Sequence, residues 1–271
     1  MLFQKMMGKG PASMISPDAP KGLWAWGNNA DGQLGLGNTT SKSSPVQVGA
    51  LATWSQITAG NAHSLSLKTD GTLWAWGHGG YGRTGLGDVI LRSSPVQVGA
   101  LATWSAITAG QGHTLALKTD GTLWAWGYNN TGNLGLGDEI KRSSPVQVGT
   151  MSTWSAVSAG SSFSTALKTD GTLWSWGTGV LGRLGLGDAT NKSSPVQVGT
   201  LATWSKIRTG ANHSFAIKTD GTLWVWGNNG SGRLGLGDTV QRSSPVQVGT
   251  LATWTTIAKG PGAEHLLGLH T

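Results

Sequence analysis

The stretch that decides the fold is Lys-Thr-Asp-Gly-Thr-Leu-Trp-Ala-Trp-Gly, residues 68–77. Asp-Gly between two alternating apolar runs is a strong hairpin signal, because a two-residue type I′ turn needs positive φ at both central residues. His63, Leu65 and Leu67 share one face before the turn, and Trp74 and Trp76 share one face after it. The stretch therefore predicts a β-hairpin. Close copies of it lie at residues 118–127, 168–177 and 218–227.

A period of 50 residues extends outward from this hairpin, beginning at Lys21. Ser-Ser-Pro-Val-Gln-Val-Gly occurs five times, starting at residues 43, 93, 143, 193 and 243. Four short strands in each period, without any helical periodicity, are typical of a β-propeller blade. In the first copy we expect the strands Pro45–Val48, Trp54–Ala59, His63–Thr69 and Thr72–Trp76.

The two ends of the repeated region complement each other. Gly22–Gly27 matches the last strand of a unit, and Pro245–Val248, Trp254–Ala258 and Glu264–Thr271 match the first three. Joined in space they would form a fifth blade, with a C-terminal strand paired to an N-terminal one, which would remove exposed sheet edges. The 15 Trp residues agree with three per blade. We therefore predict an all-β, five-bladed propeller over residues 21–271, with four antiparallel strands per blade.

Composition supports a folded, turn-rich chain. Of its 271 residues 44 are Gly and only 11% are charged, but each buried Trp removes about 150–250 Å² from water, which offsets the ordering of a Gly-rich backbone. The absence of Cys excludes disulfides, thiolate metal sites and a Cys nucleophile, and it fits a reducing compartment.

The segment 1–20 shares nothing with the repeats. Its three Pro and two Gly residues predict an irregular tail, either a disordered leader or an anchor to a neighbouring subunit. We find no signal peptide and no apolar run that could span a membrane, so the compartment stays open between the cytoplasm and an assembled particle.

The repeats resemble those of the regulator of chromosome condensation family. The resemblance rests on units such as Gly60–Gly77 and Gly127–Asp138 and covers residues 21–271. It implies a β-propeller, usually of seven blades, and in some members nucleotide exchange on a small GTPase. The exchanging founder inserts a wedge from one blade, whereas every interior unit here has 50 residues, which disfavours exchange. The related plant ultraviolet-B photoreceptor carries Trp just before the repeat His. Those positions here hold Ala62, Gly112, Ser162 and Asn212, so we interpret the Trp residues as blade packing.

No set of residues indicates catalysis. Asp70 and its equivalents are turn residues, and the Gly-x-Gly-x-x-Gly matches at 80–85 and 230–235 have no following helix to bind a dinucleotide. A His recurs at one repeat position, with Phe163 in its place in the third copy; we favour hydrogen bonding between strands over a metal site. We expect no enzyme activity, no cofactor and no metal. The recurring histidines are His63, His113, His213 and His265.

Two sets of residues are candidates for binding. The copies differ most after each Trp-Gly, and binding commonly occurs on loops held by a rigid scaffold. A basic residue also recurs before each Ser-Ser-Pro, but an Asp lies four residues upstream of most copies and aromatic residues for base stacking are few, so nucleic acid is disfavoured. The candidate partner-binding loop residues are Asn28, Asn29, Asp31, His78, Tyr81, Tyr128, Asn129, Asn130, Leu181, Asn228 and Asn229. The candidate basic ring is Lys42, Arg92, Arg142, Lys192 and Arg242.

These observations favour a non-enzymatic scaffold for protein–protein interaction. A structural subunit of a large assembly, such as a virion or surface appendage anchored by residues 1–20, is the alternative. A small-GTPase regulator is a third, disfavoured reading. Tail deletion separates the first two, because an anchored subunit would leave its assembly while a free scaffold would keep its partner.

Overall fold

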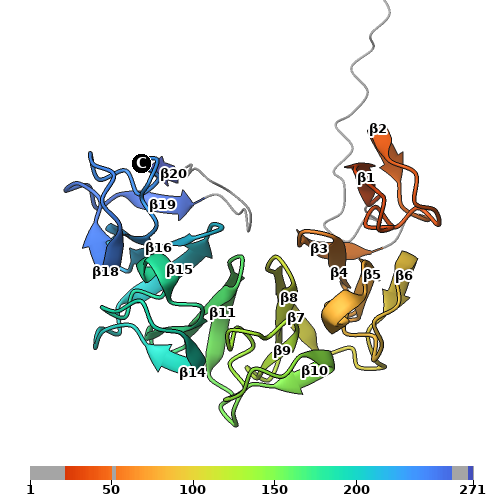
Figure 1. Cartoon of the computed structure of the whole chain (residues 1–271), viewed down its shortest axis with the longest axis horizontal. Coiled ribbons are helices and arrows are strands. Elements are labelled where there is room, and N and C mark those ends of the chain that lie inside the picture. The colour runs from red at the N-terminus through yellow and green to blue at the C-terminus, as the bar shows by residue number, and fades with distance from the viewer. Residues whose placement is uncertain (1–21, 51–52, 258–267, 271) are drawn as a thin grey trace, which may run out of the picture.

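A computed structural model describes residues 22–50, 53–257 and 268–270. The predicted tail 1–20, and most of the strand predicted at Glu264–Thr271, lie outside the described residues. Within the described part, strands follow one another around an open arc (Figure 1). No described helix is long and apolar enough to cross a bilayer.

Four sheets of four antiparallel strands form the body of the arc, and we call them blades 1 to 4. In blade 1, β3 (Trp54–Ala59), β4 (His63–Lys68), β5 (Leu73–Gly77) and β6 (Arg92–Gln97) lie in that order. The innermost strands of successive blades contact one another, as in β3 with β7 and β11 with β15. Blade 2 contains β7 (Trp104–Ala109), β8 (His113–Lys118), β9 (Leu123–Gly127) and β10 (Arg142–Gln147). Blade 3 contains β11 (Trp154–Ala159), β12 (Phe163–Lys168), β13 (Leu173–Gly177) and β14 (Lys192–Gln197). Blade 4 contains β15 (Trp204–Thr209), β16 (His213–Lys218), β17 (Leu223–Gly227) and β18 (Arg242–Gln247).

Two sheets of two strands stand at the ends of the arc. The N-terminal half-blade pairs β1 (Trp24–Gly27) with β2 (Lys42–Gln47), and the C-terminal half-blade pairs β19 (Trp254–Ile257) with β20 (Gly268–His270). They are separate sheets with an opening between them (Figure 1). The predicted pairing of an N-terminal with a C-terminal strand is therefore not formed among the described residues.

The blade boundary differs from the one predicted. The Ser-Ser-Pro strand pairs with the Trp strand before it, so that Trp74 lies opposite Gln97 and Gly77 opposite Arg92. The reason is topological: the chain leaves β5 through a long loop, returns antiparallel as β6, and only then crosses to the inside of the next blade. Consequently each end of the arc holds two strands, instead of the one and three expected.

The deciding hairpin also has a different turn. The amide of Gly71 donates to the carbonyl of Lys68 at 3.0 Å, and Gly71 has φ +80°, whereas Asp70 is not among the described residues with positive φ. A turn followed by one left-handed Gly gives a three-residue loop instead of the two-residue type I′ turn. Asp70 serves it by accepting hydrogen bonds from the amide and hydroxyl of Thr72, at 2.9 and 2.7 Å, and these bonds lower the pKa of its carboxyl.

Tryptophan packing joins the blades. In the cluster between blades 1 and 2, Leu65 and Ala75 pack with Trp104 and Trp126, and Trp126 is completely buried. The rings of Trp104 and Trp126 lie 6.0 Å apart, a favourable edge contact. The interpretation of the Trp residues as packing residues agrees with this arrangement in the body of the arc.

The second Trp of each Trp-x-Trp pair in the body of the arc packs against a glycine of the preceding blade or half-blade. We call this glycine the Trp seat. A Cβ at Gly85 would lie 2.7 Å from Nε1 of Trp126, and that indole donates to the carbonyl of Arg83 at 3.1 Å. Gly85 also has φ +75°, so both space and backbone require glycine there. The equivalent seats are Gly35 for Trp76, Gly135 for Trp176 and Gly185 for Trp226.

Candidate functional site

The loops that follow β1, β5, β9, β13 and β17 gather on one edge of the arc, which we call the variable rim. They lie beside the short turns that join the two inner strands: the amide of His78 donates to Ala62, and that of Tyr128 to Gly112. The blades below are nearly identical in sequence, while these loops differ. Every predicted partner-binding residue lies on this rim.

Three of the predicted rim residues are internal. Asn129 is fully buried; its side chain donates to the carbonyl of Asp138 at 2.9 Å and accepts from the amide of Leu134 at 2.9 Å. Asn29 and Asn229 are buried in the same way. These amides hold the loop conformation and do not face a partner. The remaining candidates are exposed or half-buried: Asn28, Asp31, His78, Tyr81, Tyr128, Asn130, Leu181 and Asn228.

The structure brings two of the candidates together. The rings of Tyr81, from blade 1, and Tyr128, from blade 2, lie 5.2 Å apart in an edge contact. Lys141 places its ammonium 4.5 Å from the Tyr81 ring and 5.8 Å from the Tyr128 ring. Arg83 lies 5.5 Å from the Tyr81 ring. Sequence reasoning missed Arg83 and Lys141 as members of one cluster, because the contact depends on how adjacent blades pack.

The basic ring residues begin the outermost strands instead of lying in the preceding loops. Four of them pair with the Asp four residues upstream, for example Arg142 with Asp138 at 2.6 Å and Lys192 with Asp188 at 3.1 Å. Hydrogen bonds from Thr190 and Lys192 lower the pKa of Asp188. Partly exposed pairs of this kind contribute little stability, but they cancel much of the positive field. Lys42 differs, because Asn38 stands where the others have Asp.

Two of the recurring His side chains, those of His63 and His113, connect neighbouring blades. His63 Nε2 is 3.2 Å from the hydroxyl of Thr114, and His113 Nε2 is 3.0 Å from that of Ser164. Burial lowers the pKa of His63 to about 3 and that of His113 to about 4, so both rings are neutral near pH 7. These distances fit the predicted hydrogen-bonding role for His63 and His113, whereas neither ring nitrogen of His213 has a hydrogen-bond partner among the described residues. His265 lies outside the described residues.

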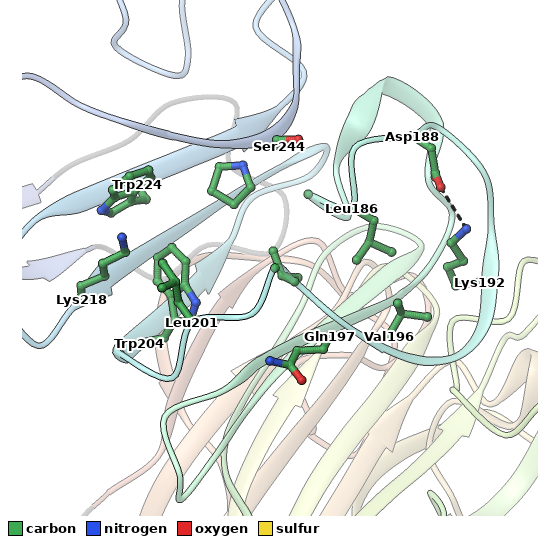
Figure 2. A pocket seen from close by; sticks show the side chains of 14 residues that line it. Leu186, Asp188, Lys192, Val196, Gln197, Leu201, Trp204, Lys218, Trp224 and Ser244 are labelled. Carbon is green, nitrogen blue, oxygen red and sulfur yellow. Dashed lines mark hydrogen bonds and ion pairs between the residues drawn. The ribbon is translucent and has the colours of Figure 1, made fainter.

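A groove between blades 3 and 4 was not anticipated (Figure 2). Leu186 and Val196 line one side and Trp204 and Trp224 the other, with Lys218 Nζ stacked 3.6 Å from the Trp224 ring centroid. The same groove recurs between blades 1 and 2. Its sequence signal is the Lys six residues before a Trp, which the hairpin brings onto one face. The second groove has Leu86, Leu101, Trp104, Lys118, Trp124 and Pro145.

Consecutive four-stranded antiparallel blades packed around an arc define the β-propeller class. Within that class the chain belongs to the RCC1-like domain family, whose family model matches residues 18–268. The resemblance seen in the repeats is thereby confirmed.

Solved structures agree with this fold. Human WBSCR16 is 26% identical, with a TM-score of 0.81 over 93% of this chain and 68% of that one. Yeast RCC1 (Prp20), solved bound to Kap60, is 22% identical, with a TM-score of 0.77 over 89% of this chain and 61% of that one. Prp20p from Saccharomyces cerevisiae, described with its binding properties to Gsp1p and histones, is 22% identical, with a TM-score of 0.76 over 88% of this chain and 62% of that one. The chain thus spans about two thirds of the human protein and three fifths of the yeast one.

Proposed function

We propose that the protein is a non-enzymatic scaffold whose variable rim binds another protein. One observation carries the proposal: near-identical blades, fixed to one another by Trp seats, hold loops that differ from copy to copy on a single rim. A rigid support with divergent loops is a common arrangement for recognition. That yeast RCC1 was solved with Kap60 supports protein binding as a use of this fold, although a shared fold alone does not assign a partner.

The repeat itself supplies the experiment. Residues 78, 128 and 178 are replaced by Asn, residues 30, 130 and 180 by Gly, and residues 31, 81, 131 and 181 by Ser, as at 228–231, so that the first, third and fourth positions of the five rim loops carry the same residues. Gly79 and Gly179 are kept, because a Cβ there would lie 2.2 and 2.0 Å from a backbone carbonyl oxygen. Partners in the native source are then compared by cross-linking mass spectrometry. We expect the uniform rim to lose the partner with an unchanged circular dichroism spectrum. A folded variant that retains the partner would overturn the proposal.

The unrepeated segment 1–20 favours a second candidate, a structural subunit of a large assembly such as a virion or surface appendage. Deleting residues 1–20 would then remove the protein from the assembly, whereas a free scaffold would keep its partner. Regulation of a small GTPase is the least favoured candidate, because the interior repeats carry no inserted wedge. Accelerated nucleotide release from a member of a small-GTPase panel would reinstate it.

We also infer that the chain closes into five blades by pairing β20 with β1. One contact that repeats between blades is missing among the described residues. A Cβ at Gly235 would meet none of their atoms within 4 Å, whereas one at each of its four equivalents would contact an indole. At the other end Trp26, the fifth indole of this kind, is 59% exposed. Within the described ranges, Gly235 lacks an indole and Trp26 lacks a glycine to pack against, and both belong to the same repeated contact. This match supports closure of the ring between them.

A second repeated contact between blades, made by the outermost strand, is also missing at the same place in the described part of the chain. The amide of Gly187 donates to the carbonyl of Ser243 at 2.8 Å, and a Cβ at Gly187 would lie 3.7 Å from Ser244 Oγ. Gly237 has no such neighbour among the described residues, and its repeat partners would be Ser43 and Ser44 of the N-terminal half-blade. Closure would thus reproduce contacts that the body already makes.

Because the sequence lacks Cys, an introduced pair is unambiguous. Ser44→Cys with Gly237→Cys tests closure, and Ser244→Cys with Gly187→Cys is the matched control inside the body. We expect both pairs to form an intramolecular disulfide, seen as faster migration of a monomer on a non-reducing gel. Closure within one chain would be contradicted if the control pair forms its disulfide while the test pair stays reduced. It would also be contradicted if the test pair forms a disulfide between two chains.

A further inference from the structure

We propose that the Tyr81–Tyr128–Lys141 cluster of the variable rim, together with Arg83, is the point at which the rim binds its partner, and that it recognises an acidic segment carrying an apolar side chain. This inference rests on the proposed scaffold function and names the chemistry of its partner. We call these four residues the Tyr patch.

The Tyr residues and Lys141 of the Tyr patch have no counterparts at the equivalent positions of the other repeats. The chain has two Tyr residues, and the packing of blade 1 against blade 2 brings them into contact although they are 47 residues apart. The positions equivalent to Lys141 hold Ser41, Leu91, Asn191 and Gln241, so no other unit supplies a cation there. Tyr81, Tyr128 and Lys141 therefore form a local feature of two loops, whereas the Arg at 83 recurs at 183 and 233.

Tyr81 is held in a costly backbone conformation. Its φ of +65° is shared, among the described non-Gly residues, only by Leu181 at the equivalent position of blade 3. A bulky residue in the left-handed region costs about 1–2 kcal/mol, and glycine would remove that cost. Tyr81 is nevertheless 47% exposed, so burial within the chain does not offset this strain. Strain of this kind at an exposed aromatic residue points to a contact made outside the chain.

The surroundings fit a protein partner better than a nucleic acid. Ile90 and Ile140 are 58% and 64% exposed, which adds apolar area to the two loops that carry the aromatic pair. Tyr and Arg with adjacent aliphatic area are typical of interface hot spots. Bases stack on open ring faces, whereas Tyr81 and Tyr128 meet edge to face and Lys141 lies over the Tyr81 ring.

Charge selects the chemistry of that partner. Lys141 lies against both rings and pairs with no carboxylate in the described part of the chain. Arg83 is largely buried, its Nε donates to the carbonyl of Gly80 at 3.0 Å, and burial lowers the pKa of the guanidinium, which stays charged. Lys141 is the exposed cation of the Tyr patch, and the buried guanidinium of Arg83, 5.5 Å from the Tyr81 ring, adds positive charge behind it. An exposed cation beside exposed apolar side chains is complementary to a segment in which carboxylates flank an apolar residue.

The test uses the full chain and a fluorescein-labelled peptide of repeated Glu-Glu-Leu triplets, with Gln-Gln-Leu and Glu-Glu-Ser peptides and single-stranded oligothymidylate as comparisons. The variant is Tyr81→Gly with Lys141→Gln. Glycine suits the positive φ, and Gln is the residue that the repeat itself holds at 241, so the fold is retained. Leu181→Gly with Asn191→Gln is the matched control at the same positions of blade 3.

We expect anisotropy titrations to give tighter binding of the Glu-Glu-Leu peptide than of either comparison peptide, with about a tenfold loss in the Tyr patch variant and none in the control. Absence of binding to the peptide, equal binding by both variants, or stronger binding of oligothymidylate at the same patch would overturn the inference. Failure here is distinguishable from failure of the scaffold function. If the uniform rim loses its native partner while the Tyr patch variant keeps it, the rim binds but this patch does not.

Discussion

His113 shows how the repeat uses a buried polar side chain at the scale of one residue. Its ring lies completely inside the molecule, 3.0 Å from the hydroxyl of Ser164 in the next blade, and burial lowers its pKa to about 4. His213 is similarly shifted, mainly by burial, to about 4. The fold therefore requires these rings to be neutral.

This requirement predicts acid sensitivity. In the unfolded chain a His titrates near pH 6.5, so between that pH and about 4 the unfolded state binds a proton that His113 in the folded state does not. Stability consequently falls as pH falls through this window. Replacing His113→Phe, the residue found at the equivalent Phe163, removes one such group, and Ser164 Oγ keeps its 2.8 Å bond to the carbonyl of Asn133.

We expect the thermal midpoint of His113→Phe to decrease less than that of the parent chain between about pH 7 and pH 4.5. Differential scanning calorimetry at a series of pH values measures this. The same slope in both proteins would mean that His113 does not have the depressed pKa on which the prediction depends.

At the scale of the element, the Trp seat has no space for a side chain, because a Trp of the next blade packs against it. A Cβ at Gly135 would approach Nε1 of Trp176 to 2.8 Å, while one at Gly149 would meet nothing within 4 Å, although both residues have positive φ, +73° and +62°. Gly149→Ala should therefore cost about 1–2 kcal/mol from the backbone alone. Gly135→Ala should cost about 1–3 kcal/mol more, because the indole must shift.

Urea denaturation of the two alanine variants measures the difference directly. Equal losses of unfolding free energy would show that the blades can separate enough to admit a methyl group. The comparison isolates packing between blades from the conformational cost of replacing glycine.

Local pattern predicted the strands well, because alternation and Trp spacing depend on few residues. β3 has the predicted bounds, and β4 and β5 differ by a residue at their ends. β2 is Lys42–Gln47 instead of the predicted Pro45–Val48, so it begins three residues earlier. The partner of β6 could not be predicted in the same way, since a strand with a long loop on one side and a short one on the other has two possible neighbours. The candidate site was likewise predicted only in part. Sequence differences between the copies identified the rim loops, but the internal position of Asn129 reflects its hydrogen bond to the carbonyl of Asp138, nine residues away. The Tyr81–Tyr128 contact depends on how blades 1 and 2 pack.

At the scale of the whole molecule, the contact missing at Gly235 and the exposure of Trp26 separate a closed ring from an open arc. In the arc, Trp26→Ala removes a side chain that is 59% exposed and Gly235→Ala adds a methyl group to open space, so the first should cost little and the second only its backbone strain. In a closed ring Trp26 would be as buried as Trp126, and its truncation should cost about 3–5 kcal/mol. Gly235→Ala would then resemble Gly135→Ala instead of Gly149→Ala.

Closure within one chain predicts that both variants lose stability together, because they remove the two sides of one contact. The double variant should lose less than the sum of the single losses, since the seat matters only while the indole occupies it. Urea denaturation of the parent, both single variants and the double variant measures this coupling. Two small, additive losses would show that the ring does not close through this seat. A large loss for Trp26→Ala that grows with protein concentration would instead place the indole of one copy against Gly235 of another, because only contacts between chains depend on concentration.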